Sequence, residues 1–487
     1  MLDWLDAAIR YAESWLDYQM RATELPGCVI AVAANGALVR ERAFGVADLK
    51  TGEALTPRHR FRVASRSKTF TAAGIFRLHE AAKLHLDDPV SRHVHGLDAA
   101  TGHTTIAQLL SHSSGVLRDG VDASFWQQRR PFLDDAELRA ELARPPVIDP
   151  NTRFKYSNVG FGLLGLVIEA ATGERYADWI SREIVAPFGL DETLPDAPIP
   201  EAVPAAVGHG GLLPLGKRYP VDGGESGRAL ASATGFVSTA SDLAHFFNAL
   251  DPDSAKSALS AASRCEMTRP QWSVPHVKDG RQYGLGVIAG SVGGRKWFGH
   301  AGAFPGFISR TATVPEWGVT VSIVTNAIDG FANPWVEGVI SIFDVFSRRG
   351  APEGPAILWA GRWWTIWGAV DLVPAGDKVL VAAPARLDPF GEAGELEVSD
   401  ATSGRIALAD GFASHGEPVA RTIDASGAAT YLKLGGAVLV PETALASEIG
   451  RVPHGNRANR PAPPSAGPDL GALPPSLTEL GFDHAHD

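Results

Sequence analysis

The sequence predicts an α/β protein: an antiparallel sheet flanked by helices takes in a helical insertion and is followed by a small antiparallel β-barrel. Three observations predict this order: two strand patterns joined by Asn35-Gly36, mostly helical patterns from about 86 to 250, and short strand patterns that return after 282. Asn-Gly between two strand patterns favours a type I′ turn, in which both central residues have positive φ. The sheet is therefore expected to open with an antiparallel hairpin.

The elements before the insertion follow from hydrophobic periodicity. Apolar residues recur at helical spacing over residues 2–22, which predicts an amphipathic helix packed on the sheet. Residues 28–34 and 37–44 are expected to be the two strands of the hairpin. A second helix is expected over 65–84, because its larger apolar residues fall on one side.

The insertion and the end of the sheet are predicted in the same way. The clearest helices within the insertion are expected at 105–110, 162–171 and 241–250. Short segments separated by Gly and Pro then predict strands, and a last amphipathic segment predicts a closing helix. These strands are expected at 283–289, 296–299, 307–314 and 318–325, and the helix at 335–346.

Residues 1–349 are therefore expected to form one unit, with 356–450 as a separate β-barrel. Short alternating segments with turns between them predict a small antiparallel barrel or sandwich, and the barrel is the architecture we expect. Four of the 12 tryptophans, at 359, 363, 364 and 367, open this region, and either a packing layer or a ligand-stacking surface would explain them. Residues 451–487 contain seven of the 34 prolines and predict a Pro/Gly-rich tail.

Composition limits the classes of function. The 487 residues are 45% hydrophobic and 20% charged, which excludes wholesale disorder. A formal net charge of −11 argues against a nucleic-acid partner, because such proteins present basic faces to phosphate. The two cysteines, Cys28 and Cys265, are too few for a disulfide framework. No signal peptide or membrane span is recognisable, so a cytoplasmic protein is expected unless an export signal has been trimmed.

Ser65 and Lys68 are the first candidates for chemistry. Positions i and i+3 share a helix face, so the serine hydroxyl and the lysine amine can meet. A serine needs a nearby base to act as a nucleophile, and a lysine is a base only if its pKa is lowered. Taken alone, Ser-x-x-Lys is more typical of a helix cap followed by a surface lysine.

Two further clusters look ordinary when taken one at a time. Tyr156 and Asn158 precede the apolar helix expected at 162–171, where a tyrosine is usually a packing residue. His300 and Gly302 lie between strand patterns, where a histidine beside glycines is usually a turn residue. A zinc site is not expected, because His79-Glu80 is followed at position 83 by Lys rather than the His of a zinc-protease helix.

In their order along the chain, the three clusters resemble the motifs of the serine β-lactamase and penicillin-binding-protein superfamily. The Tyr-x-Asn form is similar to the class C β-lactamase branch, the peptidase S12 type. His300-Ala301-Gly302 replaces the Lys-Thr-Gly of β-lactamases and is a form found in D-aminopeptidase and esterase relatives. Matching segments recur over about residues 20–345, and the barrel region is similar in pattern to lipocalin-like C-terminal domains of D-aminopeptidase-like peptidases.

The resemblance implies an acyl-enzyme on Ser65, with Lys68 and Tyr156 as a proton relay in which the base is unassigned. It places His300 opposite Tyr156 and the substrate, and Asn158 beside Lys68 or a substrate amide. Gly302 would line the substrate site, and the backbone N–H groups of Ser65 and Ala303 would form the oxyanion hole. These roles are assigned from the order of the three motifs along the chain.

The expected activity is therefore cofactor-free hydrolysis of an amide in a small molecule or short peptide, with D-amino-acid derivatives favoured. A carboxylesterase or a β-lactamase of the same fold is the alternative within enzymes. A non-catalytic penicillin-binding protein is the alternative from another class. The residues of all three motifs are present in this chain, which argues against a non-catalytic site. The oligomeric state is left open.

Overall fold

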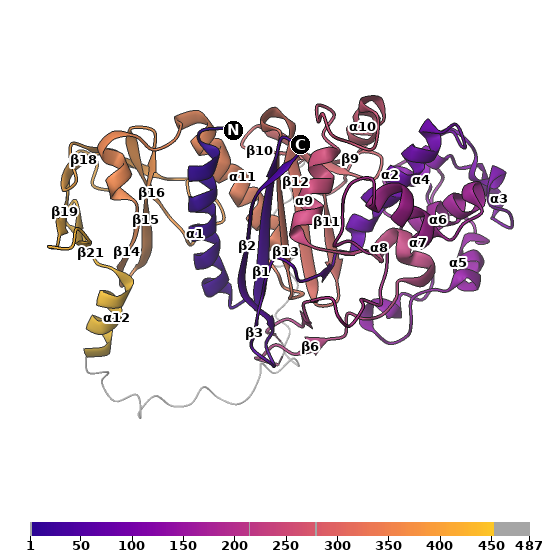
Figure 1. Ribbon diagram of the computed structural model, residues 1–487, viewed down its shortest axis with the longest axis horizontal. Coiled ribbons are helices and arrows are strands. Elements are labelled where there is room, and N and C mark those ends of the chain that lie inside the picture. Colours follow the sequence, from indigo (N-terminus) through magenta and orange to yellow (C-terminus); the bar gives the residue numbers. More distant parts are fainter. Residues whose placement is uncertain (1, 214, 278–279, 452–487) are drawn as a thin grey trace, which may run out of the picture.

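The computed structural model describes residues 2–213, 215–277 and 280–451 of the chain (Figure 1). Its centre is an antiparallel nine-stranded sheet in the order β3-β2-β1-β13-β12-β11-β10-β9-β8. The strands are β1 (Gly27–Ala34), β2 (Ala37–Asp48), β3 (Glu53–Ala54), β8 (Trp272–Ser273), β9 (Gln282–Tyr283), β10 (Ile288–Val292), β11 (Arg295–Phe304), β12 (Phe307–Val314) and β13 (Val319–Thr325). The first strand of the chain, β1, thus pairs with β13, the last strand of the sheet along the chain.

The hairpin predicted at the start of the sheet is confirmed. Asn35 and Gly36 have φ values of 51° and 78°, as a type I′ turn requires. β1 pairs with β2 on one side and with β13 on the other. All eight residues of β1 are buried, because helices cover both faces of the sheet.

One face of the sheet is covered by α1 (Leu5–Thr23) and α11 (Ala332–Arg349), which also pack on each other. The other face is covered by α9 (Ala240–Ala249), which contacts β1 and β13, and by α2 (Ser67–Glu80). Each layer encloses its own apolar core. The sheet therefore separates the side that carries α2 from the side that carries α1.

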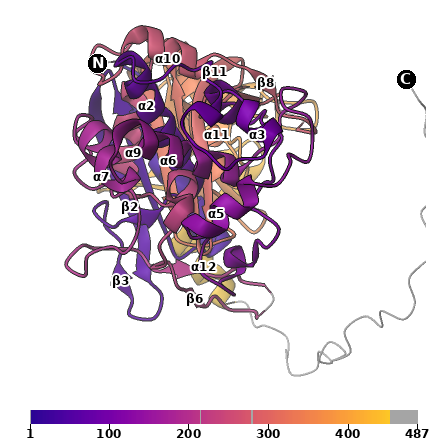
Figure 2. The same cartoon turned by 90° about the vertical axis from the view of Figure 1, so that its right-hand side faces the viewer.

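The helical insertion extends outward from α2. Figure 2 looks onto this layer, in which α6 runs beside α2, α4, α5 and α8. Its helices are α3 (Ala99–His103), α4 (Ile106–Leu110), α5 (Asp135–Leu142), α6 (Asn158–Thr172), α7 (Tyr176–Ile180) and α8 (Ala231–Thr234). Short pairs complete it, β4 (Phe61–Arg62) with β7 (Val237–Ser238) and β5 (Gly208–His209) with β6 (Pro220–Val221), and α10 (Ala261–Thr268) lies before β8.

The C-terminal part is an eight-stranded antiparallel barrel. Its strands are β14 (Gly361–Thr365), β15 (Gly368–Ala375), β16 (Lys378–Ala382), β17 (Gly394–Val398), β18 (Ser403–Leu408), β19 (Pro418–Ile423), β20 (Ala429–Leu434) and β21 (Ala437–Leu439), followed by α12 (Glu442–Arg451). A bridge between Trp364 and Val440 brings the first strand against the end of the last. The predicted fold class, α/β with a helical insertion and a following barrel, is confirmed.

The tryptophans at the start of the barrel divide into two groups. Trp359 and Trp363 are buried in the barrel core, as the packing interpretation expects. Trp364 is partly buried against Tyr18 of α1, while Trp367 at the β14–β15 turn is 93% exposed. The interior positions are therefore filled by side chains of the barrel itself.

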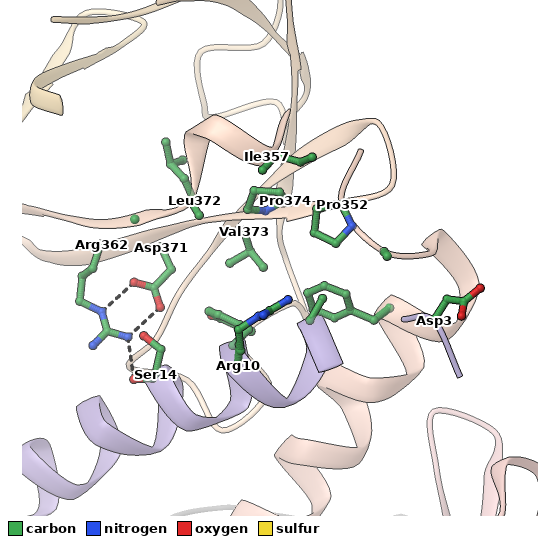
Figure 3. Close-up of a pocket in the computed structure, with 16 residues that line it drawn as sticks. Asp3, Arg10, Ser14, Pro352, Ile357, Arg362, Asp371, Leu372, Val373 and Pro374 are labelled. Carbon is green, nitrogen blue, oxygen red and sulfur yellow. Dashed lines mark hydrogen bonds and ion pairs between the residues drawn. The ribbon is translucent and has the colours of Figure 1, made fainter. Parts of the chain in front are cut away.

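The barrel is attached to α1. The indole of Trp15 donates to the Arg386 carbonyl at 3.1 Å. A cavity of about 530 Å³ lies between α1 and the barrel, and Figure 3 shows Arg362 at its edge, bonded to Asp371 and to the Ser14 carbonyl. None of the candidate catalytic residues lines this cavity.

Several predicted elements differ in their bounds. The strand expected over 296–299 extends to Phe304, so His300 and Gly302 lie within β11 and not between strands as expected. The helix expected over 65–84 begins as a 3₁₀ turn, Ala64–Arg66, and α2 ends at Glu80, since Ala82 has a φ of 54°. The strand expected over 283–289 is split into β9 and β10, because Gly286 turns between them with a φ of 82°. No helix of the described ranges is long and apolar enough to cross a membrane. The tail predicted from 451 lies, from 452 on, outside the described residues.

Candidate active site

Ser65 lies where the short strand β4 leads into α2. It is the one partly exposed residue in a buried run from 61 to 70. Ala64 before it has a φ of 49°, in the left-handed region that costs a non-glycine residue about 1 kcal/mol. At Gly302 of β11, a Cβ atom would lie 2.1 Å from the Val63 carbonyl oxygen. The glycine thus lets β11 approach the backbone that carries Ser65.

Lys68 is the immediate polar neighbour of Ser65. Its Nζ lies 3.3 Å from Ser65 Oγ, 2.6 Å from Asn158 Oδ1 and 2.8 Å from the Ala233 carbonyl oxygen. Complete burial lowers the pKa of Lys68 well below its usual value. A neutral amine has two N–H groups and one lone pair, and the two carbonyl oxygens take the N–H groups. In that neutral form the lone pair would face Ser65 Oγ, whereas a charged Lys68 donates to it.

Tyr156 contacts both residues. Its hydroxyl shares a hydrogen bond with Ser65, and its ring centre lies 4.7 Å from Lys68 Nζ. Desolvation raises the pKa of Tyr156, and the bond to Ser65 offsets this only in part. The group is therefore a protonated phenol at neutral pH. Its ring is held at 4.2 Å from that of His112, whose Nδ1 accepts from the backbone at the start of α6.

Asp119 is a residue of this cluster that sequence reasoning missed. Asn158 Nδ2 donates to Asp119 Oδ1 at 2.5 Å, and Trp126 Nε1 donates to the same oxygen at 2.9 Å. Arg118 donates to the other oxygen at 2.5 Å. Asp119 is only 5% exposed and raises the pKa of Lys68, which burial lowers more strongly. It lies in a loop without periodicity, so no local pattern marked it.

His300 lies within β11 and is buried. Its Nδ1 donates to the Ala301 carbonyl at 2.6 Å, so the Nε2 lone pair accepts from the Tyr283 hydroxyl at 3.0 Å. Burial lowers the pKa of His300 to about 3, which keeps the ring neutral. The resemblance placed this side chain opposite Tyr156 and the substrate, whereas both its nitrogens are bonded to groups of the protein. Tyr283 is a second residue that sequence reasoning missed.

Gly302 and Ala303 follow His300 on β11 and pair with Ser309 and Ile308 of β12. Beside Ala303 a cavity of about 400 Å³ opens between β11, the 126–128 loop and the β5–β6 segment. No group of three or more potential metal ligands occurs in the described part of the chain.

The site therefore joins Ser65, Lys68, Tyr156 and Asn158 in one hydrogen-bonded cluster. Comparison with known proteins decides the family, because the family model described as Beta-lactamase matches residues 12–332. The chain belongs to the beta-lactamase family. The predicted membership of the serine β-lactamase and penicillin-binding-protein superfamily is confirmed.

Relatives in the beta-lactamase family extend the match. Penicillin-binding protein 4 of Amycolatopsis lactamdurans is 31% identical over 322 residues, covering 62% of this chain and 81% of that protein. The octameric penicillin-binding protein homologue from Pyrococcus abyssi has a TM-score of 0.63 at 22% identity, covering 89% of this chain and 100% of the homologue. A D-stereospecific amidohydrolase from Streptomyces sp. has a TM-score of 0.55 at 25% identity, covering 65% and 93%. These findings support a hydrolase built on the beta-lactamase fold.

Proposed function

We propose that the protein is a serine hydrolase that forms an acyl-enzyme on Ser65. The observation that carries this proposal is the surroundings of Lys68. Its Nζ lies 3.3 Å from Ser65 Oγ, and burial lowers its pKa. A neutral amine at this distance is the general base that a serine nucleophile needs.

Acylation then proceeds with Lys68 as the base. Ser65 Oγ attacks the substrate carbonyl carbon while its proton passes to Lys68 Nζ. The ammonium formed is stabilised by Asp119, which raises the pKa of Lys68. As the carbon–nitrogen bond breaks, the Tyr156 hydroxyl gives its proton to the leaving nitrogen and regains one from Lys68. The amine leaves, and Ser65 holds the acyl group as an ester.

Deacylation repeats these steps with water. A water molecule attacks the ester carbonyl and gives its proton to Lys68. The proton returns to Ser65 Oγ as the bond to the acyl carbon breaks, which releases a carboxylic acid. The backbone N–H groups of Ser65 and Ala303 are our candidates for binding the oxyanion in both halves, a contribution of about a hundred- to a thousandfold in rate per donor.

For the substrate we propose an amide of a small peptide or of a D-amino-acid derivative. The related Streptomyces protein is a D-stereospecific amidohydrolase, which supports the amide class. His300 adds no positive charge near the site at neutral pH, because burial lowers its pKa to about 3. A substrate that needs a cation beside the third motif, such as a carboxylate-bearing lactam, is therefore less favoured. An ester would follow the same steps, with an alcohol leaving.

Labelling tests the nucleophile. A serine-reactive phosphonate is expected to add its mass to the peptide that contains Ser65, and Ser65→Ala should abolish the label. Lys68→Met should slow labelling by at least a hundredfold, because the base is lost. Lys83→Met changes an exposed lysine that follows α2 and is the matched control. Labelling at another residue, or of Ser65→Ala, would overturn the mechanism.

Turnover tests the substrate. D-aminoacyl anilides, short-chain nitrophenyl esters and a chromogenic cephalosporin should be assayed in parallel. We expect the anilides to give the highest kcat/KM relative to their uncatalysed rates. Orders of magnitude in favour of the cephalosporin would contradict the substrate ranking. Stoichiometric acylation without turnover would instead indicate a penicillin-binding protein.

A further inference from the structure

We propose that the cavity beside Ala303 is a specificity pocket that selects a bulky, uncharged group on the acyl part of the substrate. The inference rests on the proposed function, because it assigns the substrate class of the same site. If the Ala303 N–H holds the carbonyl oxygen, then the group attached to that carbonyl carbon lies at the entrance of the cavity. The pocket would then read the acyl side chain.

The lining of the cavity favours an apolar group. Trp126, Tyr219, Phe304 and Ile328 form much of its wall around a volume of about 400 Å³, within the range of small-molecule sites. None of the described residues that line it is Asp, Glu, Lys, Arg or His. A carboxylate or ammonium entering it would lose water without gaining a counter-ion, which is unfavourable.

The wall is held in place by packing from behind. Phe304 stacks on Phe132 with ring centres 5.9 Å apart, and the edge of Trp126 meets Phe304 at 6.1 Å. On Phe304, the guanidinium of the buried Arg62 lies 4.2 Å from the ring centre. Tyr219 lies against the backbone of Gly210, where a Cβ would be 2.2 Å from its ring. These contacts hold Phe304 and Trp126 in place, while Tyr219 and Ile328 form a more exposed rim.

Trp126 links the pocket to the catalytic cluster. Its Nε1 donates to the Asp119 oxygen that also accepts from Asn158, and Asn158 in turn accepts from Lys68. A substrate group packed against Trp126 would hold this chain of hydrogen bonds in place. Filling the pocket is thus expected to raise kcat as well as to lower KM.

A side-chain series with one leaving group tests the pocket. The 4-nitroanilides of Phe, Leu, Gly, Asp and Lys, each chiral one as both enantiomers, should be assayed separately. We expect kcat/KM for Phe and Leu to exceed that for Gly by about tenfold to a hundredfold, with Asp and Lys at or below Gly. Equal values across the series would overturn the proposal.

Variants assign the preference to the cavity. Ile328→Lys places a cation in its wall and should raise the Asp-to-Leu ratio at least tenfold. Tyr219→Ala should reduce the Phe-to-Gly ratio, since it removes part of the wall. Leu213→Ala changes an 83% exposed residue close to Tyr219 in sequence that does not line the cavity, and the ratios should stay unchanged. An unchanged ratio in Ile328→Lys would overturn the proposal.

Binding to an inactive variant separates this inference from the proposed function. Calorimetry on Ser65→Ala should show tighter binding of N-acetyl-phenylalaninamide than of N-acetyl-glycinamide, for at least one enantiomer. Absence of Ser65 labelling together with this preference would refute the hydrolase and leave the pocket standing. Labelling of Ser65 without any preference would refute the pocket and leave the hydrolase standing.

Discussion

The carboxylate of Asp119 lies 2.5 Å from the side-chain nitrogen of Asn158 and so fixes which end of that amide faces Lys68. A carboxylate only accepts hydrogen bonds, so Asn158 must present Nδ2 to it. Asn158 Oδ1 then points to Lys68 Nζ at 2.6 Å. The position of the proposed base is thus set by a residue that does not touch Ser65.

Asp119→Asn tests this arrangement. The new amide can keep one oxygen toward Asn158 and Trp126, but its NH₂ group would face Arg118, and the negative charge that stabilises a Lys68 ammonium is lost. We expect kcat to fall about tenfold to a hundredfold with a smaller change in KM. Asp119 raises the pKa of Lys68. Its neutralisation should therefore move the acidic limb of the pH profile of kcat/KM to lower pH.

The control is Asp122→Asn. Asp122 is an exposed carboxylate three positions further along the same loop and pairs with Arg130. Its neutralisation should leave kcat unchanged and should not move the acidic limb of the pH profile of kcat/KM. A limb that stays fixed in Asp119→Asn would contradict the coupling to Lys68.

Gly302→Ala tests the approach of β11 to the nucleophile. The new Cβ would lie 2.1 Å from the Val63 carbonyl oxygen, so one of the two backbones must move. A displacement of about 1 Å can cost roughly a hundredfold in rate, and we expect at least that loss in kcat/KM. Gly411→Ala, where the Cβ would meet no atom within 4 Å, should retain activity and melting temperature.

The pH profile tests the assignment of the base. The proposed base, Lys68, would act in its neutral form, so kcat/KM should rise once with pH through the lowered pKa of this residue. It should then stay flat to about pH 10, because desolvation raises the pKa of Tyr156. Tyr156→Phe should lower kcat by about a hundred- to a ten-thousandfold without moving the limb. A fall in activity between pH 7 and 9 would point instead to an ammonium–phenolate pair.

Acid unfolding tests the environment of His300. Its folded pKa of about 3 lies below the unfolded value of 6.5, so only the unfolded chain takes up a proton at this residue between these pH values. Stability contributed in this way is present above pH 6.5 and is lost as the pH falls, by about 1.4 kcal/mol per pH unit. Denaturant unfolding at several pH values should therefore show that the free energy of unfolding changes less steeply with pH in His300→Gln than in the wild type. The exposed His95→Gln should keep the wild-type slope.

The barrel core offers a matched pair of tryptophans. Trp363 is 4% exposed and Trp367 is 93% exposed, with three residues between them. Trp363→Ala should lower the free energy of unfolding by about 3 to 5 kcal/mol, since it leaves a large cavity. Trp367→Ala should change it by about 0.5 kcal/mol or less. Equal effects in thermal or denaturant unfolding would contradict the filled interior.

Elements with local determinants were predictable from the sequence. The strand expected over 307–314 matches β12, and Thr105 caps α4 with the reciprocal bonds of a capping box. The split between β9 and β10 was not predictable, because Gly286 turns where its Cβ would lie 2.4 Å from Ala72 of α2. β15 contains Pro374 and a buried Asp371 that is paired with Arg362, and neither residue is typical of a strand pattern.

In the candidate site, too, contacts between residues close in sequence were predictable and contacts between distant residues were not. Ser65 and Lys68 meet because they lie three positions apart, within one helical turn, which a sequence pattern can show. Asp119 and Tyr283 bond to residues 39 and 17 positions away, and only the folded chain brings them together. The roles assigned to Gly302, Ala303 and His300 stay predictions.

Ala64 has a further consequence for the proposed nucleophile. Its φ of 49° would suit glycine, yet the chain carries a side chain there. Glycine would relieve the strain, but it would also let the peptide before Ser65 adopt many more conformations. The chain therefore keeps a strained backbone conformation at the residue that precedes the proposed nucleophile.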